Sequence, residues 1–130
     1  MKYGTAIVLL HLLINVVHGA AHARLHIDLD SFDRFFVLSI ILILPLIAMV
    51  LLWTSRKTFG LGLLTCSMLA SLLFGAYHHF WVAGPDNVRS QTSEGWGLTF
   101  IVTGYGLLLT EAIGTWLGIY LLRSRRRASR

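Results

Sequence analysis

Four long apolar stretches occupy most of this chain of 130 residues and constrain its fold more than any other feature. They cover roughly residues 4–22, 34–54, 59–81 and 96–122. A helix needs about 20 apolar residues to cross the ~30 Å hydrocarbon layer of a membrane. Because no water satisfies backbone polar groups in that layer, each stretch should be helical. The sequence therefore predicts an all-α, polytopic membrane four-helix bundle that forms one transmembrane domain over residues 1–130.

Charged residues make up only 13% of the chain and lie mainly between these stretches. On one side of the predicted layout are Lys2, Arg56, Lys57, Arg123, Arg125, Arg126, Arg127 and Arg130. The other side has Arg24, Arg34 and Arg89, together with most of the acidic residues. Short loops rich in Lys and Arg stay in the cytoplasm. We therefore expect both termini to be cytoplasmic and the protein to be a multi-pass protein of a bacterial cell inner membrane.

The basic tail, residues 123–130, also raises the possibility of nucleic-acid binding. A basic run directly after a membrane span is, however, the usual pattern for contact with lipid headgroups. We therefore expect membrane lipids and no nucleic acid as partners. The single cysteine, Cys66, excludes a disulfide within the chain.

The first apolar stretch allows a second interpretation. Lys2, the apolar stretch and the sequence Ala21-His22-Ala23 resemble a secretory signal with an A-x-A cleavage site. Cleavage would remove residues 1–23 and leave three spans. We favour retention, because His11 and Asn15 interrupt the apolar region in a way that a signal does not need.

Polar residues form a line along this first stretch. His11, Asn15, His18 and His22 are separated by four, three and four residues, which places them on one helix face. Polar residues inside a membrane span are costly and usually face a partner, a cavity or a ligand. Glu111 in the fourth stretch is the candidate partner at mid-depth. At 1.5 Å per residue, His11 lies ~13 Å from Lys2 and Glu111 lies ~18 Å from Arg123. We expect His11, Asn15 and Glu111 to form a polar seam or a proton relay.

A second group of histidines is expected near the outer side of the membrane. His18 and His22 lie at the same depth as His78 and His79 at the end of the third stretch, and His26 follows one further turn along. Imidazole binds zinc, copper, iron and nickel, and haem takes one axial histidine on each side. We therefore expect His18, His22, His78 and His79 to bind a transition-metal ion or haem. Acidic residues of the outer loops could supply hydrogen-bond acceptors or further ligands: Asp28, Asp30 and Asp86. Interfacial anchoring or pH sensing remains the alternative role for the histidines.

The remaining stretches indicate how the helices pack. Pro45 predicts a kink near Ile41 in the second stretch, which has few polar residues and for which we expect no functional site.

The third stretch has a small polar face that ends in histidine, formed by Ser67, Ser71, Gly75 and His78. In the fourth stretch a seam repeats every seven residues, formed by Gly97, Gly104, Glu111 and Gly118. Small residues of this kind allow close approach of another helix, and the Gly114/Gly118 pair could serve a homo-oligomer.

The chain contains no phosphate-binding glycine loop, no G-x-S-x-G sequence and no C-x-x-C pair. We therefore expect a binding or accessory protein rather than an enzyme. Two alternatives remain: a structural subunit of a larger membrane complex, and a proton-coupled small carrier that acts as a dimer with Glu111 as its titrating group.

Three short segments also carry a resemblance. They are His18-Gly19-Ala20-Ala21-His22, Tyr77-His78-His79-Phe80 and Gly84-Pro85-Asp86-Asn87-Val88. Together they are similar to segments of small bacterial four-helix integral membrane proteins to which no activity is assigned. The resemblance implies that the outer histidines and the loop around Pro85 belong to one unit.

Overall fold

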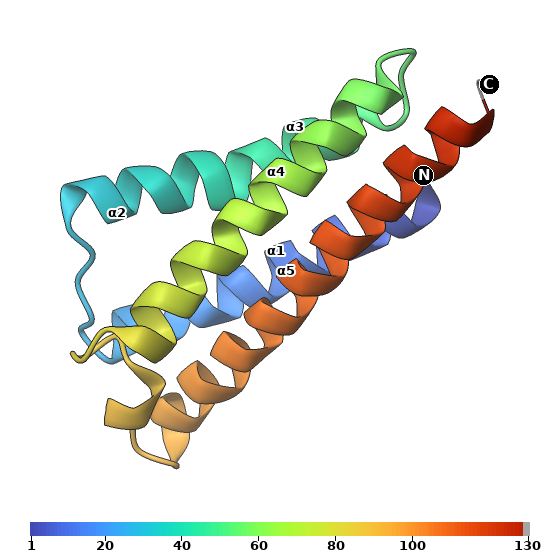
Figure 1. The fold of residues 1–130 in the computed structure, drawn as a ribbon. Coiled ribbons are helices and arrows are strands. Elements are labelled where there is room, and N and C mark those ends of the chain that lie inside the picture. Colours follow the sequence, from blue (N-terminus) through green and yellow to red (C-terminus); the bar gives the residue numbers. More distant parts are fainter. Residues whose placement is uncertain (129–130) are drawn as a thin grey trace.

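The computed structural model describes residues 1–128 and is all-α, with no strand among these residues (Figure 1). Its elements are the α-helices α1 (Lys2–Arg24), α2 (Ser31–Phe36), α3 (Leu44–Leu51), α4 (Lys57–Ala76) and α5 (Gly95–Ala128), the π-helical segments η1 (Val37–Ile43) and η2 (Tyr77–Trp81), and the short 3₁₀ helix η3 (Val88–Ser90). Because α2, η1 and α3 are continuous, and α4 continues into η2, the chain makes four helical passes. The predicted helical bundle is confirmed. The part of the basic tail beyond Ala128, including Arg130, lies outside the described residues.

Each pass is long and apolar enough to cross a membrane. The four candidate spans are Lys2–Arg24, Ser31–Leu51, Lys57–Trp81 and Gly95–Arg127. The predicted boundaries differ from these by only a few residues, except at the end of the last helix. That helix continues into the basic run, because Arg123 to Arg127 are compatible with helical structure and follow the apolar residues without a break.

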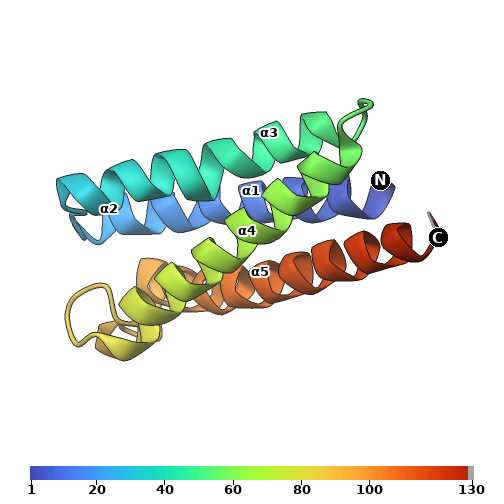
Figure 2. The same cartoon turned by 45° about the horizontal axis from the view of Figure 1, so that its top comes forward.

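The fourth pass is central to the packing. Helix α5 packs along both α1 and α4, while α3 packs mainly on α4 (Figures 1 and 2). The backbone of the second pass at α2 diverges from α4 and α5 in both views, and side chains bridge the gap to α4, where the rings of Phe36 and Phe74 stack with centroids 4.6 Å apart. We call the end of the bundle with segments 25–30 and 82–94 the loop end, and the opposite end the terminal end. The second pass is therefore held chiefly at the terminal end.

The predicted disturbance around Ile41 takes the form of π-helical turns rather than a broken helix. Segment η1 spans Val37–Ile43, and Pro45 lies in the first turn of α3. Proline has no N–H to donate to the carbonyl four residues earlier, and its ring crowds that carbonyl. The wider π turn accommodates this defect.

Small residues on α5 contact the other helices, as the seven-residue seam predicts. A Cβ added at Gly118 would collide with Thr65 on α4, and one added at Gly114 would lie 3.0 Å from Met68 Cγ. This face is therefore used within the chain. The suggestion that Gly114 and Gly118 could serve a homo-oligomer is corrected by this packing, because α4 already occupies the face.

Two apolar clusters form the core and leave polar residues between them. The cluster at the terminal end includes Val8, Leu52 and Met68, and that at the loop end includes Ala21 and Phe100. His11, Ser71 and Glu111 are buried polar residues outside these clusters. The polar residues that the sequence singled out are thus inside the bundle.

Candidate metal centre

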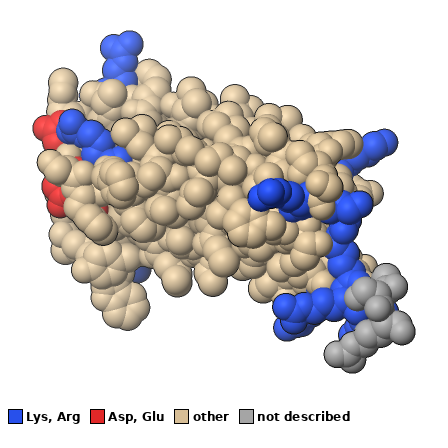
Figure 3. All heavy atoms as spheres, turned by 90° about the horizontal axis from the view of Figure 1, so that it is seen from above, with Lys and Arg blue, Asp and Glu red and all other residues tan. Residues whose placement is uncertain are grey.

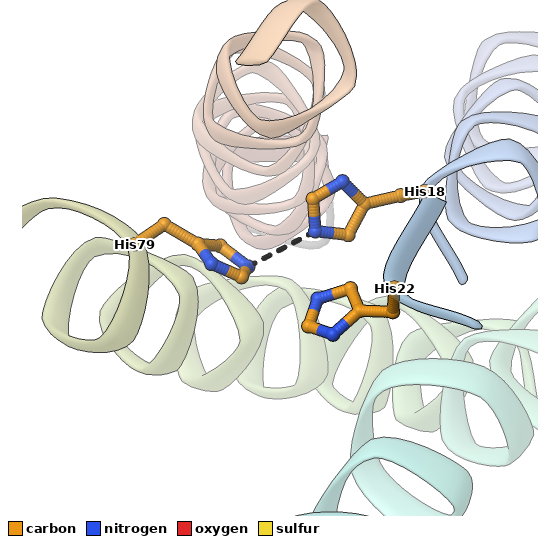
Figure 4. Close-up of side chains that lie close together, drawn as sticks. All are labelled: His18, His22 and His79. Atoms are coloured by element: carbon orange, nitrogen blue, oxygen red, sulfur yellow. Dashed lines mark hydrogen bonds between the residues drawn. The ribbon is translucent and has the colours of Figure 1, made fainter. Parts of the chain in front are cut away.

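Three histidines gather inside the loop end of the bundle. His18 and His22 lie one turn apart on α1, and His79 comes from η2 (Figure 4). One nitrogen from each ring lies within 4.8 Å of the other two. We call His18, His22 and His79 the histidine cluster. Of the four histidines predicted as ligands, these three are brought together, and His78 is not among them.

At η2 only one of the two adjacent histidines enters the cluster. His79 continues a row of residues four apart, after Ser71 and Gly75, and is buried. The ring of His78 turns instead toward the second pass, where its Nε2 lies 3.7 Å from Asp33 Oδ1. It also packs on Phe74, with ring centroids 4.3 Å apart. The sequence signal for His79 was the continued spacing of four residues.

His26 also lies apart from the cluster. Helix α1 ends at Arg24, and His26 is exposed with a φ of 53°. The regular helix that would place it above His22 has therefore already ended. The expected row of three histidines on successive turns is reduced to His18 and His22.

Hydrogen-bond partners fix the proton positions on His18. Its Nδ1 lies 2.8 Å from Thr103 Oγ1. The Thr103 hydroxyl donates to the carbonyl of Thr99 at 2.6 Å, so its oxygen can only accept from His18. His18 Nδ1 therefore carries a hydrogen, and Nε2 of the neutral ring has a free lone pair.

The partners of His79 likewise show which of its ring nitrogens carries a hydrogen. Its Nδ1 lies 3.0 Å from the backbone oxygen of Asp86 and 3.1 Å from Asp86 Oδ1. Both atoms are acceptors, so His79 Nδ1 donates, and whenever the ring is neutral its Nε2 has a free lone pair. The two Nε2 atoms of His18 and His79 face each other at 3.2 Å (Figure 4). At this distance a hydrogen on either Nε2 forms a hydrogen bond to the other ring. When both rings are neutral with their hydrogen on Nδ1, the two lone pairs repel each other unless a metal ion lies between them or beside them.

His22 completes the cluster and shares the Asp86 carboxylate. Its Nε2 lies 3.3 Å from Asp86 Oδ1, while its Nδ1 is buried without a hydrogen-bond partner. Of the acidic residues expected near the site, Asp86 thus contacts two of the three rings. Asp30 instead caps α2, where its carboxylate accepts from the Asp33 N–H at 2.8 Å.

Two residues on α5 belong to the site although the sequence reasoning missed them. Thr103 accepts the hydrogen bond from His18, and Phe100 packs on the rings of all three cluster histidines, with centroids 4.7–5.3 Å away. Thr103 could have been found as a polar residue two turns before Glu111 on the inward side of the helix. Phe100 gave no such signal, because it is one apolar residue among many.

The deeper polar seam forms as predicted from depth. His11 Nε2 lies 3.1 Å from Glu111 Oε1, and both side chains are buried. Asn15 lies one turn above and donates to the backbone oxygen of His11 at 2.9 Å. The second carboxylate oxygen, Glu111 Oε2, is buried without a partner.

A cavity of about 340 Å³ connects the two polar groups of residues. Its walls include the histidine cluster, Asp86 and Glu111. No functional site was expected on the second pass. It nevertheless contributes Arg34 and three apolar side chains to the wall, those of Val37, Ile41 and Leu42. A space therefore lies between the second pass and the cluster.

Comparisons with known proteins give no match: no protein-family model, curated protein or solved structure is similar to this chain. The resemblance to small bacterial membrane proteins stays a prediction.

Proposed function

We propose that the protein is an integral membrane protein with both termini in the cytoplasm, in the inner membrane of a bacterium. The charge pattern supports this orientation, since the Lys and Arg side chains in Figure 3 gather mainly at one end of the molecule and the acidic side chains in view lie at the other. Large apolar side chains face outward along all four passes, including Leu13, Val16, Val50, Leu73, Val102 and Leu109. An exposed apolar surface of this extent is suited to lipid.

We propose further that the histidine cluster binds a first-row transition-metal ion. The observation that carries this proposal is the pair of facing Nε2 atoms of His18 and His79, 3.2 Å apart. A tetrahedral zinc ion with Zn–N bonds of ~2.0–2.1 Å holds its ligand nitrogens about 3.3 Å apart. The two Nε2 atoms are thus already at the separation that two ligands of one bound ion require.

The surroundings of the rings support the same role. Histidines that bind metals usually donate their other N–H to a carboxylate, a carbonyl or another acceptor, which fixes the ring. His18 has this partner in Thr103, and His79 has it in Asp86. Imidazole ligands suit zinc, copper, nickel and iron.

The geometry favours a bare ion over haem. Axial histidines of a haem lie on opposite sides of the porphyrin plane. His18 and His79 face each other at 3.2 Å, and Phe100 packs on both rings, which leaves no space for a macrocycle between them. We therefore propose a metal-binding or accessory role without an enzymatic reaction.

The test is the metal content of the full-length protein, purified in detergent without a metal-affinity column. We expect about one equivalent of zinc, copper, nickel or iron per chain after loading, lost in the His79→Ala variant. The matched control is His78→Ala, which changes the adjacent histidine on the same turn and should keep the metal. An empty wild-type protein, or equal loss in both variants, would overturn the assignment.

A further inference from the structure

The cavity beneath the histidine cluster has the character of a ligand pocket. Its volume of about 340 Å³ lies at the lower end of the roughly 300–1,000 Å³ range of small-molecule sites. Apolar side chains supply much of its wall, including Ile41, Leu42, Phe74, Leu107 and Leu108. Such pockets combine apolar walls with a few polar groups that orient the ligand.

Glu111 provides the polar group at the deep end. Its side chain is 3% exposed, and Oε2 has no hydrogen-bond partner, although Oε1 contacts His11. A Cβ added at Gly75 would lie 3.8 Å from Glu111 Oε2 and 3.9 Å from His79 Cδ2. The absence of a side chain at Gly75 therefore leaves open the space between the carboxylate and the histidine cluster.

The charges around the cavity favour a cationic occupant. Three carboxylates line it, those of Asp28, Asp86 and Glu111, against a single guanidinium, that of Arg34. A buried carboxylate oxygen without a hydrogen-bond partner, such as Glu111 Oε2, is costly, and a cation that donates a hydrogen bond to it removes much of that cost. The three acidic groups do not converge on one point at the deep end, where Glu111 is the only carboxylate. A single ammonium group matches this arrangement better than a second metal ion, which needs several ligands.

We propose that this cavity binds a small apolar molecule with a protonated primary amine, whose ammonium group donates to Glu111 Oε2 while its apolar body packs on the Leu, Ile and Phe side chains. This site shares a wall with the proposed metal site, because the histidine cluster lines the same cavity. It depends on the unpartnered oxygen Glu111 Oε2 and on the open space at Gly75, and not on a bound metal.

The test uses the full chain in detergent with a chelator present, so that no metal contributes. Fluorine NMR titration compares 4-fluorobenzylamine with 4-fluorobenzyl alcohol, which has the same shape and no charge. A hydrogen bond that involves a buried charge predicts at least about tenfold tighter binding of the amine. Equal affinity for the two compounds, or no saturable binding of the amine, would overturn the proposal.

Two variants test the location of the site by different routes. Glu111→Gln keeps the shape of the side chain and removes its charge, and it should abolish the preference for the amine. Gly75→Leu fills the space in front of the carboxylate and should weaken amine binding at least tenfold. Gly62→Leu is its matched control on the same helix, because a Cβ at Gly62 meets nothing within 4 Å. Unchanged amine binding in Gly75→Leu, with helicity and melting temperature retained, would refute this location.

Discussion

Replacement of Thr103 by valine removes one hydroxyl from beside the proposed metal site and keeps the shape of the side chain. In the wild type, Thr103 Oγ1 accepts from His18 Nδ1 at 2.8 Å and so leaves the lone pair on Nε2, the atom that faces His79. In the variant the valine side chain has no acceptor, so it favours neither ring nitrogen of His18 as the position of the hydrogen. The ring then loses both its orientation and its preferred tautomer.

The size of the effect follows from the role of such partners. Loss of a group that orients a metal ligand typically lowers metal affinity by about 10- to 100-fold. This corresponds to about 1.4–2.7 kcal/mol of binding free energy. Competitive titration of zinc against a chromophoric chelator measures the change directly, with the protein in detergent.

Thr99→Val is the matched control, one turn earlier on α5. Thr99 Oγ1 donates to the carbonyl of Gly95 at 3.2 Å, and its side chain forms no hydrogen bond to a cluster histidine. We expect wild-type zinc affinity in this variant, and recovery of affinity in Thr103→Ser, which restores the hydroxyl. Nitrogen NMR of the metal-free protein should show the proton on His18 Nδ1 in the wild type and a mixture of tautomers in Thr103→Val. Equal affinity in Thr103→Val and the wild type would show that Thr103 does not orient His18 for metal binding.

Three further predictions concern stability and acid sensitivity. Gly118→Ala should lower the free energy of unfolding by about 1–3 kcal/mol, because its Cβ meets Thr65 on α4, whereas Gly62→Ala should not; thermal unfolding in detergent compares the two. His11→Leu should destabilise by about 3–5 kcal/mol, because it leaves the buried carboxylate of Glu111 without its partner. The double variant with Glu111→Leu should be less destabilised than His11→Leu alone, and additive losses would contradict the pairing. Zinc affinity should fall as the pH is lowered, because protons compete with the metal for imidazole nitrogens, and a pH-independent affinity would contradict histidine ligation.

The positions of the four passes could be predicted from the sequence because the apolar character of a stretch is a local property. The same holds for the contact of His11 with Glu111. Their depths follow from the rise per residue of a helix, and two buried polar groups at one depth in an apolar environment are driven together. The seven-residue seam of small residues on α5 was also visible in the sequence, although its partner helix was not.

Which side chains meet at the loop end of the bundle depends on the packed structure. The rotation of each helix about its axis follows from packing against all the others, and this packing places His79 rather than His78 in the cluster. The same packing brings Thr103 of α5 to His18 of α1, a contact between residues 85 positions apart. The cavity between the second pass and the cluster is likewise a property of the assembled bundle. The sequence thus determined the helices and the position of each polar group along its helix, and the packed bundle determined which of these groups share a site.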